Sequence, residues 1–180
     1  MMQTLLVQDL IFIDETGVDL ALTRLRARSP RASRAHGKRP SKRGKRVSII
    51  SAINIKEVMT HCQLIGTTDG LTFEAFISQR LVPKLCKGAC VIMDNCSIHK
   101  GKEIKDLIEA AGAILIYLPP YSPDFSPIEN CFSKIKSTLR SIGARTYSDL
   151  VKATEEGFSQ VYEEDLKGWF THCCYCTSPE

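Results

Sequence analysis

Three acidic residues, Asp14, Asp94 and Glu129, each follow an apolar run that is typical of a buried β-strand. The three runs are Leu10–Ile13, Ala89–Met93 and Ile114–Leu118. A carboxylate at the end of a covered strand is costly to bury unless it is paired or binds a cation. If the first and central strands are neighbours, the three carboxylates can converge, and an oxygen-rich cluster suits Mg²⁺ or Mn²⁺. The pattern therefore predicts a site for two-metal phosphoryl transfer.

Glu129 also has a purely structural interpretation. Ser126 stands where a helix N-cap belongs, Pro127 occupies the first helical position, and Glu129 follows the cap by three residues. In such a capping box the glutamate reaches back to the N-cap amide and has no further role. The prolines between the preceding strand and this helix fix the path of the loop, but the direction of the Glu129 side chain stays open.

The motifs around these carboxylates resemble the catalytic core of the DDE transposases. The matching stretches are Ile13–Gly17, Met93–Asn95 and the Tyr-Leu-Pro-Pro-Tyr-Ser-Pro-Asp run of residues 117–124 with its downstream Pro-Ile-Glu. Thirty-four residues separate Asp94 from Glu129, and the likeness extends over about residues 11–173. The bacterial IS630 group within the Tc1/mariner superfamily is the most similar. One closely related group ends its triad in aspartate, whereas position 129 is glutamate.

This resemblance implies an RNase H-like fold with Asp14, Asp94 and Glu129 as catalytic and metal-binding residues. Two Mg²⁺ (or Mn²⁺) ions would support cleavage of DNA strands and transfer of 3′-OH ends. Three further residues, Glu15, Asn95 and His99, are expected around the triad. Glu15 is an alternative ligand, and His99 could orient a phosphate or the attacking water or be a structural histidine.

A strongly basic segment, residues 24–46 and called here the basic arm, has eleven Lys or Arg residues and no Asp or Glu. The rest of the chain has 13 basic and 20 acidic residues, so the positive charge is concentrated in one place. We expect the arm to contact DNA phosphates, with a solvated loop and a localisation signal as the alternatives. The expected DNA-binding residues are Arg24, Arg26, Arg28, Arg31, Arg34, Lys38, Arg39, Lys42, Arg43, Lys45 and Arg46 of the arm, together with Lys136.

Length and composition predict one catalytic domain over residues 1–180, since 43% of the residues are apolar. No apolar stretch is long enough for a membrane span, and no secretory leader is recognisable. The eight cysteines lack the spacing of a disulfide framework, and the Cys173, Cys174 and Cys176 group is sterically awkward for one zinc ion. We expect a cytoplasmic protein, associated with the bacterial nucleoid.

The expected architecture is an α/β mixed sheet, antiparallel in its first three strands and then parallel, flanked by helices. The expected strands are Leu10–Glu15, Val18–Thr23 after a hairpin at Thr16-Gly17, Val47–Ile55, the central strand ending at Asp94, and a buried strand Ile114–Leu118. Residues 57–68 are expected to form a further short strand or a turn. Helices are expected after a Thr72 cap, over Lys102–Ala111, over Pro127–Ser141 and after a Ser148 cap, with Trp169 and Phe170 docking the tail.

The resemblance also defines the expected partners. Relatives carry a helix-turn-helix region before the catalytic core, whereas this chain begins at the first core strand. We therefore expect that region to be encoded separately, supplied by frameshifting or lost. We also expect a homodimer on DNA that comprises element ends and target. Two alternatives stay open: an RNase H-like nuclease or resolvase that does not join strands, and an inactive or truncated DNA-binding relic.

Overall fold

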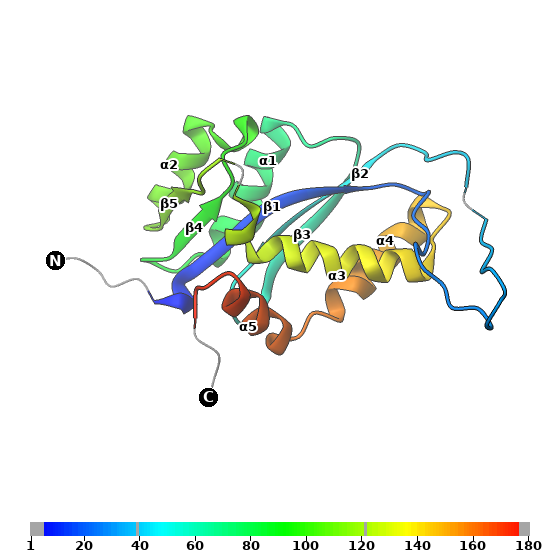
Figure 1. Cartoon of the computed structure of the whole chain (residues 1–180). Coiled ribbons are helices and arrows are strands. Elements are labelled where there is room, and N and C mark those ends of the chain that lie inside the picture. Colours follow the sequence, from blue (N-terminus) through cyan, green and yellow to red (C-terminus); the bar gives the residue numbers. More distant parts are fainter. Residues whose placement is uncertain (1–5, 39, 121, 177–180) are drawn as a thin grey trace.

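The computed structural model describes residues 6–38, 40–120 and 122–176, and a five-stranded sheet forms its centre (Figure 1). The strands are β1 (Leu10–Val18), β2 (Val47–Ile53), β3 (Val58–Ile65), β4 (Cys90–Met93) and β5 (Ile114–Tyr117), in the spatial order β3-β2-β1-β4-β5. The first three strands are antiparallel, while β4 is parallel to both β1 and β5. This arrangement confirms the expected mixed sheet.

Helices cover both faces of the sheet (Figure 1). One face carries α1 (Gly70–Phe76), which continues through a π-helical turn, and α2 (Lys102–Ala110). The other carries α3 (Pro127–Ile142), α4 (Tyr147–Ser159) and α5 (Glu163–His172). Among the described residues, no helix has both the length and the hydropathy to cross a bilayer.

Successive side chains of β1 contribute to two hydrophobic cores, one on each face of the sheet. Ile11 and Ile13 pack with α1 and α2, whereas Phe12 points to the opposite face and packs with α3 and α5. Successive side chains of a strand point to opposite faces, so a strand covered on both sides must be apolar at consecutive positions. The uninterrupted apolar run before Asp14 follows from this double coverage.

The expected hairpin at Thr16-Gly17 and the strand Val18–Thr23 are wrong. β1 continues through both residues to Val18, which pairs with Val47 of β2. The basic arm is therefore part of the long connection between these two paired strands. The Arg46 side chain lies against Gly17, where a Cβ would come within 1.9 Å of it. The glycine therefore marks a close approach of a side chain to the strand and not a turn.

Two helix caps lie earlier in the chain than expected. Asp69, not Thr72, is the N-cap of α1, and its side chain accepts a hydrogen bond of 2.8 Å from the Thr72 backbone N–H. Thr146, not Ser148, caps α4 and accepts from the Asp149 N–H at 3.1 Å. The segment before each of these helices contains several side chains that can act as an N-cap within one turn. The residue types alone do not indicate which one is used.

The strand expected to be buried at Ile114–Leu118 is instead an edge strand, β5. Its residues Ile114 and Ile116 are 44% and 41% exposed. Leu115 and Tyr117, which alternate with them, pack on the core formed with α1 and α2. The apolar run is thus covered on one face only.

The C-terminal helix α5 docks on the sheet, as Trp169 and Phe170 indicated. Phe170 is fully buried, and its ring meets that of Phe12 edge to face at 5.3 Å and 85°. The tail is therefore part of the core that supports β1.

Phe170→Ala is expected to lower the free energy of unfolding by about 3–5 kcal/mol, because it leaves a cavity under β1 and removes the edge-to-face contact. Urea denaturation measures the change. Val151→Ala, at a side chain 43% exposed on α4, is the control and should stay within about 0.5 kcal/mol of the parent. A loss below about 1 kcal/mol for Phe170→Ala would contradict the docking of α5.

Candidate functional site

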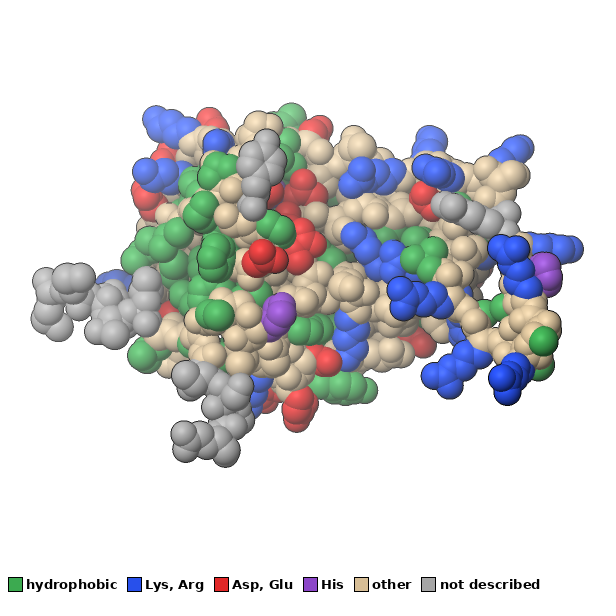
Figure 2. Space-filling view, viewed as in Figure 1, with side chains coloured by type: hydrophobic (Ala, Val, Ile, Leu, Met, Phe, Trp, Pro, Cys, Tyr) green, Lys and Arg blue, Asp and Glu red, His purple; other side chains and the backbone are tan. Residues whose placement is uncertain are grey.

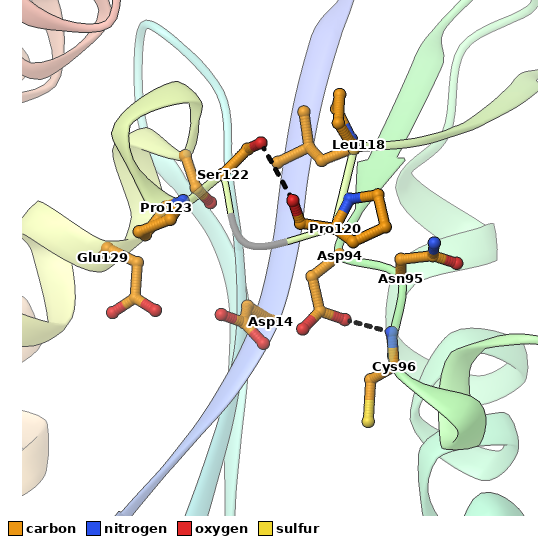
Figure 3. Close-up of a pocket in the computed structure, with 11 residues that line it drawn as sticks. Asp14, Asp94, Asn95, Cys96, Leu118, Pro120, Ser122, Pro123 and Glu129 are labelled. Atoms are coloured by element: carbon orange, nitrogen blue, oxygen red, sulfur yellow. Dashed lines mark hydrogen bonds between the residues drawn. The ribbon is translucent and has the colours of Figure 1, made fainter.

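Parallel pairing of β1 with β4 brings Asp14 and Asp94 to the same edge of the sheet. Phe12 pairs with Ile92, and each aspartate lies two residues further along its own chain. Both aspartates therefore belong to the face on which Phe12 and Ile92 pack with α3. The backbone N–H of Cys96 donates to Asp94 Oδ1 at 2.9 Å and helps to fix its carboxylate (Figure 3).

Glu129 lies in the first turn of α3, across from the two aspartates. Ser126 is the N-cap and Pro127 the first helical residue, as expected, but the Ser126 side chain makes no capping hydrogen bond. The reciprocal capping box is therefore not formed. The Glu129 side chain is exposed and points to the same space as Asp14 and Asp94 (Figure 3).

The three carboxylates line one open cavity of about 500 Å³, called here the acidic cavity. Its remaining walls come from the segment after β4 and from the proline-rich loop before α3. The lining residues are Asp14, Asp94, Asn95, Cys96, Leu118, Pro119, Pro120, Ser122, Pro123, Ser126 and Glu129. The structure thus brings together the predicted triad and Asn95, but neither Glu15 nor His99 lines this cavity.

No lysine or arginine of the described residues compensates the charges in the acidic cavity, although the His99 ring contacts Asp94 from behind the sheet. Burial, together with the nearby carboxylates of Glu15, Asp94 and Glu129, raises the pKa of Asp14 to about 7, although the Glu15 N–H opposes the shift. Among the described residues, no lysine or arginine forms an ion pair with Asp14, Asp94 or Glu129. The cavity can therefore accept positive charge.

The ligand atoms of the acidic cavity do not form one compact group. Within the described part of the chain, the residues whose potential ligand atoms all lie within 4.8 Å of one another are Asp14, Glu15 and His99. The three carboxylates of the acidic cavity do not meet this spacing as a group. In this arrangement one small ion would not contact all three carboxylates directly, because Mg²⁺ binds oxygen ligands at about 2.1 Å.

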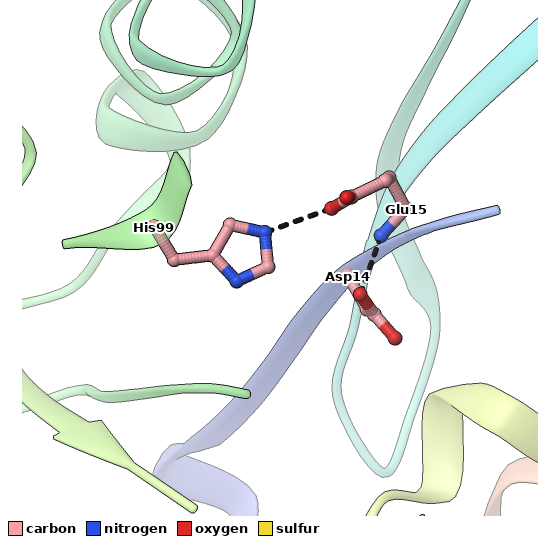
Figure 4. Close-up of side chains that lie close together, drawn as sticks. All are labelled: Asp14, Glu15 and His99. Carbon is pink, nitrogen blue, oxygen red and sulfur yellow. Dashed lines mark hydrogen bonds and ion pairs between the residues drawn. The ribbon is translucent and has the colours of Figure 1, made fainter. Parts of the chain in front are cut away.

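Glu15 and His99 lie on the opposite face of β1 from the cavity (Figure 4). The fully buried His99 ring donates from Nε2 to Glu15 Oε2 at 2.8 Å. Its Nδ1 lies 2.5 Å from Asp94 Oδ1 without the angles of a hydrogen bond. Burial lowers the pKa of His99, but the hydrogen bond to Glu15 and the charges of Glu15, Asp94 and Asp14 outweigh it and raise the pKa overall.

The basic arm leaves the sheet after β1 and returns at β2, with irregular structure in its described residues. Arg24 Nη2 donates to Ser141 Oγ at 2.7 Å, so the arm begins against the end of α3. Arg39 lies outside the described residues, and Lys136 is half-buried on α3. The DNA-binding role of these residues stays a prediction.

Arg145 and Tyr147 hold the ends of the arm and were not foreseen from the sequence. Arg145 Nη1 donates to the carbonyls of Leu20 and Leu22 at 3.2 and 2.9 Å. The Tyr147 hydroxyl accepts from the Lys45 N–H at 2.5 Å. These contacts join segments more than 100 residues apart, and no local motif indicates them.

The sequence matches the model of one known protein family. The family model described as "DDE superfamily endonuclease" matches residues 9–151, which include the three carboxylates of the acidic cavity and the basic arm. No curated protein sequence matches the chain.

Solved structures of Mos1 transposase share the fold. A pre-cleavage Mos1 transpososome is 16% identical, with a TM-score of 0.73 over 94% of this chain and 54% of that one. A Mos1 mariner paired-end complex with Mn is 18% identical, with a TM-score of 0.71 over 93% and 53%. The Mos1 catalytic domain with Raltegravir and Mg is 15% identical, with a TM-score of 0.68 over 94% and 80%. The sheet is RNase H-like, and the chain spans about half the length of the first two structures' chains.

Asp14→Asn is expected to stabilise the metal-free protein, and more so at alkaline pH. The folded-state pKa of Asp14 is raised from 3.8 to about 7, so its ionisation favours the unfolded chain. Below about pH 4 Asp14 is protonated in both states and does not reduce the free energy of unfolding. That free energy falls as the pH rises to about 7 and stays low above that, because the unfolded chain ionises first. Asparagine has no charge to bury.

The Tm in EDTA at about pH 4 and about pH 8 measures this effect. The gain from Asp14→Asn should be at least about 3 °C larger at the higher pH. Asp106→Asn, at an exposed position on α2, should give the same small change at both pH values. An equal gain in Tm at both pH values for Asp14→Asn would show that ionisation of Asp14 does not destabilise the folded protein.

Proposed function

Because the chain belongs to the DDE superfamily endonucleases, we propose that it is the catalytic core of a DNA transposase, which cleaves DNA strands and transfers their 3′-OH ends. The observation that carries this proposal is the acidic cavity. Three carboxylates from β1, the end of β4 and the start of α3 line one space, and the described residues offer them no ion pair with lysine or arginine.

The donor set of the cavity fits two Mg²⁺ or Mn²⁺ ions. Carboxylate oxygens are the preferred ligands of these ions, and burial together with the neighbouring carboxylates raises the pKa of Asp14 to about 7, a cost that a bound cation would relieve. The wide spacing of the three carboxylates favours two ions over one. Asp14 and Asp94 would hold the first, and Glu129 with one of the aspartates would hold the second. Bound ions of this kind activate a water or 3′-OH nucleophile and stabilise the leaving oxygen.

The chain's own residues would orient these ligands. The Cys96 N–H and the His99 ring both contact Asp94 Oδ1, so they limit the rotation of its carboxylate. Glu15 fixes His99 in turn and is tied to Asp14 through its own N–H, which donates to Asp14 Oδ1 at 2.7 Å. Glu15 and His99 thus support the triad from behind the sheet, and Asn95 borders the cavity.

The finer assignment within the superfamily rests on the motifs. Met93–Asn95 and the proline-rich run of residues 117–124 support the IS630 group of the Tc1/mariner superfamily. The substrate would be DNA, comprising element ends and target, with the basic arm on the phosphates. A homodimer on the DNA completes the proposal.

Asp94→Asn and Glu129→Gln are each expected to reduce Mg²⁺-dependent nicking of plasmid DNA by more than about 100-fold, because each removes a charged metal ligand. DNA binding, measured by fluorescence anisotropy in EDTA, should be unchanged. Glu103→Gln is the matched control, since Glu103 also lies in the first turn of a helix but does not line the cavity. Equal nicking by the parent and the two triad variants would refute the assignment.

Strand transfer separates the transposase from its alternatives. A labelled duplex with a free 3′-OH is incubated with plasmid DNA, and joined products are separated on a denaturing gel. Joined products that require both Mg²⁺ and Glu129 are expected. Nicking without joining would indicate a nuclease, and binding without either reaction would indicate an inactive DNA-binding relic.

A further inference from the structure

A second cavity of about 460 Å³ lies between the basic arm and the C-terminal end of α3, and is called here the basic cavity. Five cationic side chains line it, namely Arg24, Arg26, Lys38, Arg140 and Arg145. No aspartate or glutamate is among its described lining residues. Figure 2 shows the Lys and Arg side chains gathered over this end of the molecule, away from the acidic side chains nearer its middle.

The basic cavity is built by specific contacts, which hold the first residue of the arm and the segment just before it in place. Arg145 donates to the carbonyls of Leu20 and Leu22, and Arg24 donates to the Ser141 hydroxyl. These neutral acceptors hold the guanidinium groups without cancelling their charge. Like charges held together in this way repel unless an anion binds among them.

Helix α3 relates the basic cavity to the acidic one. Lys136 and Arg140 follow Glu129 by seven and eleven residues, so each lies within about 20° of Glu129 around the helix axis and the three share one face. At 1.5 Å per residue, Lys136 and Arg140 lie about 10 and about 16 Å along the axis from Glu129. Phosphates of a DNA strand recur every 3.4 Å of axis, so 16 Å corresponds to about 5 base pairs.

We propose that the basic cavity binds backbone phosphates of the same DNA duplex whose scissile phosphate lies in the acidic cavity, with Arg140 of α3 as a DNA contact beside the arm. This inference rests on the proposed function. The site would add sequence-independent, salt-sensitive affinity, because contacts to phosphates fix the position of a duplex and do not read its bases. A duplex lying along this face of α3 would reach Lys136 before Arg140.

Protection of arginines from phenylglyoxal tests the site on the unaltered protein. The full chain is treated in EDTA with and without a random-sequence duplex, and modified peptides are quantified by mass spectrometry. Arg140 should lose most of its reactivity when DNA is bound. Arg80, an exposed arginine beside β3 that lines a different cavity, is the internal control and should keep its reactivity. Equal reactivity of Arg140 with and without bound DNA would overturn the proposal.

A variant gives an independent measurement. Arg140→Gln should reduce the slope of log Kobs against log[NaCl] by about 0.9, the value for one lost phosphate contact, with Lys105→Gln on α2 as the unaffected control. Circular dichroism verifies that both variants fold. An unchanged slope for Arg140→Gln would argue against the site.

The outcomes separate this inference from the proposed function, because both measurements are made without metal. Protection of Arg140 in a protein that never nicks DNA would keep the site and refute the catalytic assignment. Nicking that depends on Asp94, together with an unprotected Arg140, would refute the basic cavity and keep the catalytic core.

Discussion

The structure depends on one electrostatic constraint, the meeting of like charges at the end of the parallel pair β1–β4. Parallel register carries Asp14 and Asp94 to the same edge, and the start of α3 adds Glu129. Carboxylates in such a place are unfavourable without a cation, and the pKa of Asp14 near 7 expresses that cost. Apolar packing on both faces of β1 and β4 must offset it, because the described residues provide no lysine or arginine partner.

The alternation of β1 assigns its two consecutive carboxylates to different tasks. Asp14 points toward α3 and the acidic cavity, while Glu15 points the other way and pairs with the buried His99. His99 also contacts Asp94, so its imidazole connects Glu15 on one face of the sheet with the acidic cavity on the other. Phe73 of α1 packs on the His99 ring with 4.3 Å between the ring centroids, and the Tyr117 hydroxyl donates to the His99 carbonyl. A buried, fully surrounded histidine is a rigid support for a carboxylate.

Much of this site could be predicted from the sequence, because the signals that define it are local. Apolar runs ending in Asp14 and Asp94, and a proline at the start of α3, need no tertiary information to be recognised. Errors arose where several local solutions compete or where a distant residue decides. Asp69 and Thr72 are both good caps, and Gly17 indicates a turn until Arg46 is seen beside it.

The exposure of β5 and the anchoring of the arm could not be predicted for a related reason. An apolar run indicates that a strand is extended, but only the packed helices determine whether one face or both are covered. Ile114 and Ile116 remain exposed although Leu115 between them is packed. Likewise, Arg145 looks like any surface arginine until the carbonyls of Leu20 and Leu22, just before the arm, are placed next to it.

Helix α3 combines these features into one rigid element with opposite charges at its two ends. Glu129 lies at the N-terminus and Arg140 in the last turn, and the helix dipole favours both placements. The helix packs on the sheet through Ile128, Phe132 and Ile135, so its axis is fixed relative to β1. A ligand that binds at both ends must therefore match a fixed length. Duplex DNA is stiff and has phosphates at regular intervals, so it can meet that requirement without deforming the protein.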